Sequence, residues 1–180
     1  NQPDVLEIVA EMRALLAAYP GDPVLIGEIY RPVETLVAYC GTRERGLQMP
    51  TNFNLFSTPW RAEAILDLVA RYEAALPTGA WPNWVLGNHD IGRIATRIGR
   101  AQAAVAMLML MTLRGTPTLY QGDELGMEDV TVPPDRARDP FARFGPGRGR
   151  DAERAPMPWD EGPQAGFSTE TPWLPLPPAG

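Results

Sequence analysis

Three short apolar runs in the first 124 residues lead into acidic side chains, which are Glu28, Asp90 and Glu124. These residues are separated by 62 and 34 positions. A (β/α)8 barrel uses about 31 residues for each strand and helix, so the gaps correspond to two units and one unit. Barrel enzymes carry their reactive groups at the C-terminal rim of the strands. The spacing therefore places the three carboxylates where they could take part in catalysis.

The segments around these carboxylates predict helices that alternate with short strands. We expect helices from Pro3 to before Pro20, from Pro32 to about Ala38, over Arg61–Leu76 and over Ala101–Leu113. We expect strands, most of them buried, at Val24–Ile26, Leu47–Asn54, Trp84–Leu86 and Pro117–Tyr120. This alternation is typical of parallel β/α units. An open doubly wound sheet has the same rhythm, but the glycine-rich phosphate loop of that fold follows none of the strands.

The last third of the chain differs from the rest in its proline content. Eleven of the 20 prolines follow residue 132, and proline breaks helices because it lacks a backbone donor. Aromatic residues recur through the same stretch, at Phe141, Trp159 and Trp173 among others. A disordered linker rarely holds so many aromatic side chains. We therefore expect an ordered loop region over residues 128–180.

Composition excludes several classes of protein. The chain has 180 residues, 16 of them arginine and none lysine, and a formal net charge of −6, which disfavours a nucleic-acid partner. Cys40 is the single cysteine and His89 the single histidine, so an internal disulfide is excluded and a protein-only zinc site is disfavoured. The apolar run Ala101–Leu113 is shorter than the roughly 20 residues that span a bilayer. We expect no metal, no cofactor, no membrane partner and a cytoplasmic location.

Several motifs carry a family resemblance. Residues 26–30, 86–90 and 115–127 read IGEIY, LGNHD and GTPTLYQGDELGM. Residues 46–53, 150–160 and 165–167 read GLQMPTNF, RDAERAPMPWD and AGF. In this order and at this spacing, the set strongly resembles the α-amylase family of glycoside hydrolases. The match is closer to the α-glucosidase and oligo-1,6-glucosidase branch of that family.

The resemblance implies an α/β fold, the (β/α)8 TIM barrel, of which the part from about strand 5 through the loop after strand 8 is present. The strands that begin near Val24, Leu47, Trp84 and Pro117 would be the fifth to eighth. Residues 1–127 would then form the C-terminal half of the catalytic barrel, and residues 128–180 a long excursion after strand 8 of the same domain. The aspartate nucleophile of the family lies on strand 4. We expect it before Asn1, in the remainder of the same polypeptide.

The resemblance also implies roles for the two carboxylates of the first motifs. Glu28 matches the acid/base of a retaining glycosidase, which protonates the leaving oxygen. Partial burial would raise the pKa of this acid so that it carries a proton near neutral pH. Asp90 matches the third carboxylate, which hydrogen-bonds sugar hydroxyls and favours the oxocarbenium-like transition state. From composition alone, Glu28 would instead be an exposed loop residue.

Two further residues match substrate-binding positions. His89 resembles the residue that donates a hydrogen bond to a sugar hydroxyl, so we assign it to binding and not to proton transfer. Arg154 resembles the arginine that closes the pocket around the terminal glucose, since its planar fork of donors suits adjacent hydroxyls or a carboxylate. A salt bridge that braces the loop is an equal alternative for Arg154.

Other polar residues near these motifs receive structural roles. We expect Arg93 and Arg97 on a helix surface or in ion pairs. The acidic pair Asp123 and Glu124 is mainly structural in the family, although its position at a strand end suggests catalysis. Cys40 is expected to be a small buried apolar residue.

The function expected from the resemblance is hydrolysis of α-glucosidic bonds in small oligosaccharides of the maltose or isomaltose type. The mechanism would be retaining, with general acid/base catalysis and a covalent glycosyl-enzyme. A transglycosylating relative that forms trehalose or isomaltulose is one alternative, and a non-catalytic interaction protein on the same fold is another. The presence of Glu28 together with His89 and Asp90 favours an enzyme.

Overall fold

The computed structural model describes residues 3–41, 45–145 and 147–178. These residues fall into two compact units. Of the described residues, those up to Val85 and Thr112–Thr118 form the first unit, and Leu86–Met111 and those from Leu119 onward form the second. The strands of the sheet belong to the first unit, and the proline-rich third of the chain belongs to the second.

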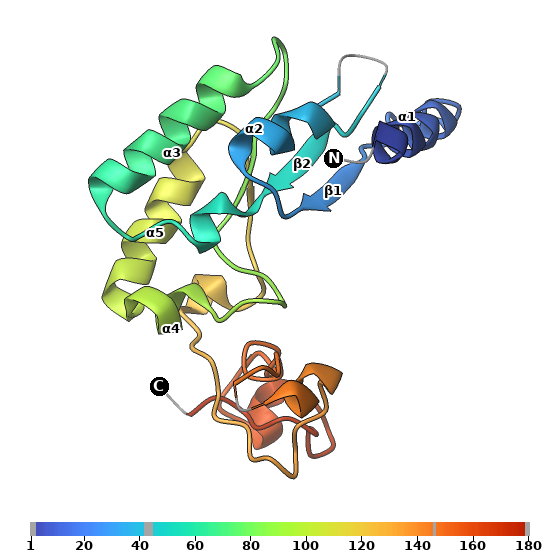
Figure 1. The fold of residues 1–180 in the computed structure, drawn as a ribbon. Coiled ribbons are helices and arrows are strands. Elements are labelled where there is room, and N and C mark those ends of the chain that lie inside the picture. Colours follow the sequence, from blue (N-terminus) through green and yellow to red (C-terminus); the bar gives the residue numbers. More distant parts are fainter. Residues whose placement is uncertain (1–2, 42–44, 146, 179–180) are drawn as a thin grey trace. The chain divides into compact units, whose positions relative to one another are not determined.

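A parallel sheet of four strands organises the first unit. Strands β1 and β2 are labelled in Figure 1. The strands are β1 (Ile26–Ile29), β2 (Met49–Asn52), β3 (Asn83–Val85) and β4 (Thr116–Thr118). Each strand pairs with the next one in the sequence, in the order β1-β2-β3-β4, and all three pairs are parallel. Parallel neighbours need crossover connections, and helices supply them here. The parallel β/α arrangement expected from the sequence is confirmed.

Strand β1 begins two residues later than the sequence suggests and includes Glu28, which lies opposite Thr51 of β2. The side chain of Gln48 accepts a hydrogen bond from the Leu25 backbone N–H at 2.8 Å and donates one to the Pro23 carbonyl at 3.1 Å. Because these backbone groups bond the Gln48 side chain, they are not available to pair with β2, and the strand begins after them. The expectation of a buried strand is also wrong here, since Ile26 is 57% exposed on this edge strand.

The helices of the first unit are α1 (Pro3–Leu16), α2 (Val33–Leu36) and α3 (Ala62–Ala75). All three are predicted from the sequence, and α2 continues as a 3-10 turn to Tyr39. Apolar residues of α3, Leu66, Leu68 and Tyr72 among them, are predicted from the sequence to share one face, and Leu68 and Tyr72 are buried one turn apart, whereas the prediction is wrong for Leu66. Leu66 is 69% exposed, because two residues along a helix turn a side chain to the opposite face.

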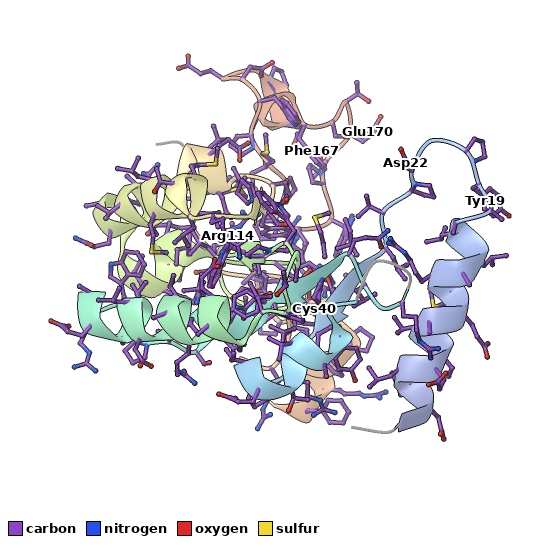
Figure 2. The ribbon with its side chains drawn as sticks, turned by 90° about the horizontal axis from the view of Figure 1, so that it is seen from above. Tyr19, Asp22, Cys40, Arg114, Phe167 and Glu170 are labelled. Atoms are coloured by element: carbon purple, nitrogen blue, oxygen red, sulfur yellow. The ribbon has the colours of Figure 1, made fainter. Side chains whose placement is uncertain are left out.

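The core of the first unit is built around Trp84 of β3 and Tyr72 of α3. The two rings meet edge to face with centroids 5.0 Å apart, and the Trp84 indole donates to the Arg114 carbonyl at 3.0 Å. Cys40 is buried beside Tyr72, and this burial raises the pKa of its thiol to about 11. The expectation that Cys40 is a small buried residue is confirmed (labelled in Figure 2).

The second unit contains helices α4 (Ile94–Ile98) and α5 (Arg100–Thr112, whose last residue belongs to the first unit), joined at Gly99. Residues 127–145 and 147–178 contain 3-10 turns at Pro140–Phe144 and Pro163–Gly166, but no α-helix or strand (orange to red in Figure 1). Met127, Val130 and Ala155 form a small buried cluster within this stretch. Within the described ranges, no helix is both long enough and apolar enough to cross a membrane.

Candidate functional site

The loop that follows β3 carries His89 and Asp90. Asn88 is buried, and its side-chain oxygen accepts a hydrogen bond from the Asp90 backbone N–H at 2.9 Å. Asn88 also forms a single antiparallel bridge with Ile91. An asparagine that bonds the backbone two residues later stabilises a tight turn. This turn fixes the backbone from which the two predicted site residues extend.

Two arginines hold the carboxylate of Asp90. Arg150 donates from Nη1 to Asp90 Oδ1 at 2.6 Å, and Arg154 donates from Nη2 to the same oxygen at 3.0 Å. His89 Nε2 lies 3.6 Å from that oxygen as well. Because both guanidinium groups use Oδ1, the second oxygen of Asp90 can accept a hydrogen bond from a ligand hydroxyl. About 30% of the Asp90 side chain is exposed, so a ligand can reach it.

Arg154 links both predicted residues of the loop. Its Nε donates to the His89 carbonyl at 2.7 Å, while Nη2 bonds the Asp90 carboxylate. The structure therefore shows the salt bridge that the sequence allows for this residue. A contact with a sugar stays a prediction for Arg154 and for His89.

Arg150 is the residue of this site that the sequence analysis does not single out. It contacts Asp139 through two side-chain hydrogen bonds, Nε to Oδ2 at 2.8 Å and Nη2 to Oδ1 at 3.0 Å. The Asp139 side chain is fully buried, and the Arg150 hydrogen bonds lower its pKa while Asp139 raises the pKa of Arg150. The guanidinium also lies 4.2 Å from the centre of the Phe141 ring. Its spacing of four residues from Arg154 in one motif is the signal that could have identified it.

Asp151 fixes the backbone on which this ion pair is built. Its Oδ2 accepts hydrogen bonds from the backbone N–H groups of Arg138 at 2.7 Å and Asp139 at 2.9 Å. Asp151 is itself buried. A buried carboxylate that receives two backbone hydrogen bonds is well satisfied, so its role is structural.

Arg93 is fully buried, which corrects the expectation of a helix-surface residue. Its Nη1 donates to the Gln121 carbonyl at 2.7 Å, and its guanidinium lies 4.8 Å from the centre of the Tyr120 ring. The Arg93 backbone N–H donates to Asp129 Oδ1 at 2.8 Å, and the Tyr120 hydroxyl donates to the Glu153 carbonyl at 3.1 Å. These contacts join three segments of the second unit: the start of α4, the segment at Tyr120 and Gln121 that follows β4, and the loop that carries Arg154. Arg93 is buried because Tyr120 and Gln121 pack around its guanidinium group.

Asp123 and Arg97 both contact backbone groups of the protein, whereas Arg97 was expected on a helix surface or in an ion pair. Asp123 is buried and accepts a hydrogen bond from the Tyr120 backbone N–H at 3.1 Å. Burial raises the pKa of Asp123 and lowers the pKa of Arg97. Arg97 donates to the Leu86 carbonyl, which holds the start of the His89–Asp90 loop against α4.

Glu28 lies in the first unit, and its side chain is exposed. The partial burial expected for a catalytic acid is therefore not provided by the described residues around it. Two residues further on, Tyr30 stacks on Phe53 with ring centroids 4.0 Å apart, so this ring packs against protein. Because Glu28 and Asp90 belong to different units, their meeting in one pocket stays a prediction.

Comparison with known proteins identifies the family. The family profile described as "Alpha amylase, catalytic domain" matches residues 1–180. The chain belongs to the α-amylase family. Among curated relatives of this α-amylase-family chain, Maltase A2 of Drosophila melanogaster is 36% identical over 99% of the chain and 32% of its own length. The probable alpha-glucosidase of Rhizobium meliloti (strain 1021) is 31% identical over 98% of the chain and 34% of its own length. The α-amylase-family chain thus spans about one third of the curated relatives that it matches.

Solved structures support the same assignment. A crystal structure of an alpha-glucosyl transfer enzyme matches with a TM-score of 0.88 and 38% identity, covering 98% of this chain and 34% of that one. The trehalulose synthase of Pseudomonas mesoacidophila MX-45 matches with a TM-score of 0.81 and 26% identity, covering 98% of this chain and 38% of that one. The expectation of an α-amylase-type catalytic domain is confirmed for this α-amylase-family chain.

Proposed function

We propose that the protein containing this chain is a retaining α-glucosidase that acts on small α-glucosides such as maltose and isomaltose. The observation that carries the proposal is the Asp90 carboxylate, which two arginines hold through one oxygen while the other remains available to a substrate hydroxyl. The alpha-glucosidase and maltase names of several relatives support the substrate class. The activity belongs to the full-length protein, because the chain spans one third of these relatives.

We further propose that β1 to β4 are the fifth to eighth strands of a (β/α)8 barrel. The order of the motifs supports this register, since IGEIY lies at β1, LGNHD follows β3, and GTPTLYQGDELGM contains β4. Residues 1–127 would be the C-terminal half of the barrel, and residues 128–180 the excursion after its last strand. The nucleophilic aspartate would lie elsewhere in the same polypeptide.

The chemistry divides between three carboxylates. A carboxylate nucleophile attacks the anomeric carbon, and the bond from that carbon to the leaving oxygen breaks as Glu28 donates its proton to the oxygen. Water then attacks the glycosyl ester and gives its proton to Glu28, which restores both groups. Asp90 accepts hydrogen bonds from hydroxyls next to the reacting carbon, and His89 donates to another hydroxyl. In a retaining mechanism the carboxyl groups of the nucleophile and of Glu28 should lie about 5–5.5 Å apart.

Glucosyl transfer is the second candidate function. The alpha-glucosyl transfer enzyme is 38% identical over 98% of this chain, and Maltase A2 is 36% identical over 99% of it. Transfer differs from hydrolysis only in the second step, where a sugar or alcohol hydroxyl attacks the glycosyl ester in place of water. The same residues would serve both reactions.

The first test is the product formed by the full-length protein from maltose, isomaltose and sucrose. Proton NMR should show that glucose is first released as the α-anomer, and new glucosides should accumulate if transfer competes. Initial release of the β-anomer, or no turnover of any α-glucoside, would overturn the proposal. The 180-residue chain alone should be inactive on p-nitrophenyl α-glucoside. Robust turnover by it would show that the nucleophile lies in this chain and that the proposed register is wrong.

A further inference from the structure

Asp139 is a buried carboxylate of the second unit that is linked to Asp90 through Arg150. Arg150 lies between the two acids: it bonds Asp139 through Nε and Nη2, and it bonds Asp90 Oδ1 through Nη1. Arg154 bonds the same Asp90 oxygen at 3.0 Å. All four side chains belong to the second unit. They therefore form one row of alternating charges, in the order Asp139, Arg150, Asp90 and Arg154.

The hydrogen bonds of Asp139 fix the orientation of the Arg150 guanidinium group. Besides the two side-chain bonds, the Asp139 carboxylate accepts the Arg150 backbone N–H at 2.7 Å and the Phe141 backbone N–H at 3.2 Å. The Arg150 guanidinium carbon also lies 4.2 Å from the centre of the Phe141 ring. A bidentate pair between an arginine and a carboxylate is specific in geometry, because both bonds must form at once. This arrangement leaves Nη1 of Arg150 for Asp90, and it lies 2.6 Å from Oδ1.

Asp139 also balances the charge of the arginine beside Asp90. The Asp139 side chain is fully buried, and a buried carboxylate acts on its neighbours with less screening by water than an exposed one. The hydrogen bonds from Arg150 lower the pKa of Asp139, so this carboxylate is ionised at neutral pH. The formal charges of the two arginines and the two aspartates in the row then cancel. If Asp139 were neutral, the same row would carry a net positive charge.

We propose that Asp139 is a positioning residue for the reaction: it fixes Arg150 against Asp90 and cancels the Arg150 charge, so that the site stabilises a positively charged sugar. This role rests on the proposed function, in which positive charge develops on the sugar ring as the bond to the leaving oxygen breaks. Arg150 can then hold Asp90 in place without making the site repel that charge. A role confined to holding the loop would not depend on the charge of the ligand.

The test compares the binding of a cationic ligand with that of a neutral ligand by the full-length protein. Isothermal titration calorimetry gives the Kd of 1-deoxynojirimycin, a glucose analogue whose ring nitrogen carries a proton, and the Kd of glucose, which is neutral. The measured quantity is the Kd of glucose divided by the Kd of 1-deoxynojirimycin. Because a Kd does not depend on the fraction of molecules that fold, this ratio can also be measured for a less stable variant.

Asp139→Asn removes the negative charge and keeps the size of the side chain. We expect the ratio to fall about four- to fifteenfold, for unit charges about 10 Å apart and an effective dielectric constant of about 20 to 40. Asp135→Asn is the matched control, because Asp135 lies in the same loop region, is exposed and makes no ion pair with the residues that the structure describes. The control should keep the wild-type ratio.

A double variant separates the charge of Asp139 from its structural contacts. In Arg150→Gln/Asp139→Asn the remaining charges of the row, on Asp90 and Arg154, cancel again. We therefore expect the ratio to return close to the wild-type value, although the contacts between the two side chains are changed further. A wild-type ratio in Asp139→Asn, or a double variant with a ratio as low as that of Asp139→Asn, would overturn the proposal.

Hydrolysis is measured separately from these binding constants. If the full-length protein hydrolyses no α-glucoside, the proposed function fails, while the Kd ratio still decides the role of Asp139 because calorimetry needs no turnover. If the protein hydrolyses α-glucosides and the ratio does not change in Asp139→Asn, the role of Asp139 fails and the proposed function stands. If the wild-type protein binds neither ligand, the role proposed for Asp139 is wrong.

Discussion

Replacement of Arg154 by methionine removes the contacts of one arginine and keeps a side chain of similar length. The wild-type guanidinium bonds the Asp90 carboxylate at 3.0 Å and the His89 carbonyl at 2.7 Å. Arg150 still holds Asp90 Oδ1 at 2.6 Å in the variant. We therefore expect that the Asp90 carboxylate remains paired with Arg150 but rotates more freely. It should then bind the transition state less tightly.

The expected loss follows from the bond to Asp90. A hydrogen bond to a charged group contributes about 1.5–3 kcal/mol, and each 1.4 kcal/mol is about tenfold in a rate or equilibrium constant. Loss of this one bond therefore predicts a fall in kcat/KM of roughly 10- to 100-fold. The lower end of this range is favoured because 29% of the Arg154 side chain is exposed to water.

The assay measures kcat/KM of the full-length protein on maltose for Arg154→Met and for Arg148→Met. Arg148 lies in the same loop region, is exposed and makes no ion pair with the residues that the structure describes, so it serves as the control. The control should keep the wild-type value. Equal kcat/KM values in the Arg154→Met and Arg148→Met variants would refute the role given to the Arg154–Asp90 pair.

Three further predictions concern stability, each read from melting temperatures of the full-length protein. The pKa of Asp139 is lowered in the folded protein, so its ionised carboxylate contributes to the free energy of folding above its ordinary pKa of about 3.9, and this contribution is lost as the pH falls below that value. Asp139→Asn should therefore be less stable than wild type at pH 7, and the difference should shrink toward pH 3. Burial raises the pKa of Glu153, so wild-type stability should decline as the pH rises from 4.5 through that raised pKa, and Glu153→Gln should lack the decline. Leu68→Ala should cost about 2–5 kcal/mol, while Leu66→Ala should cost less than about 0.5 kcal/mol. Flat pH profiles, or equal costs at the two leucines, would contradict these assignments.

The helices were the most predictable part of the fold. Both α1 and α3 combine a helical period of apolar residues with clear punctuation, and their observed bounds lie within one residue or a short turn of the expected ones. Strand β1 was placed two residues early. An apolar run does not specify which backbone groups form the hydrogen bonds of a sheet. Here the Gln48 side chain bonds the Leu25 N–H and the Pro23 carbonyl, which lie before Ile26.

The residues of the candidate site could be predicted where they match a motif, but the contacts between residues far apart in the sequence could not. His89, Asp90 and Arg154 were identified from their motifs, and the structure brings these three together. Arg93 was expected on a helix surface or in an ion pair, but it is buried and donates to the Gln121 carbonyl, a partner 28 residues away in the sequence. Arg150 was missed although it lies in the same motif as Arg154, because the motif alone does not show that the buried Asp139 pairs with it.

The role of Glu28 as the proton donor is the central claim of the proposed mechanism. The measurement is kcat/KM of Glu28→Gln in the full-length protein, on maltose and on α-glucosyl fluoride. An alkoxide leaving group needs a proton, whereas fluoride does not. We expect a loss of roughly a hundredfold or more on maltose and a much smaller loss on the fluoride. An equal loss on both substrates would contradict the account and make Glu28 a binding or structural residue.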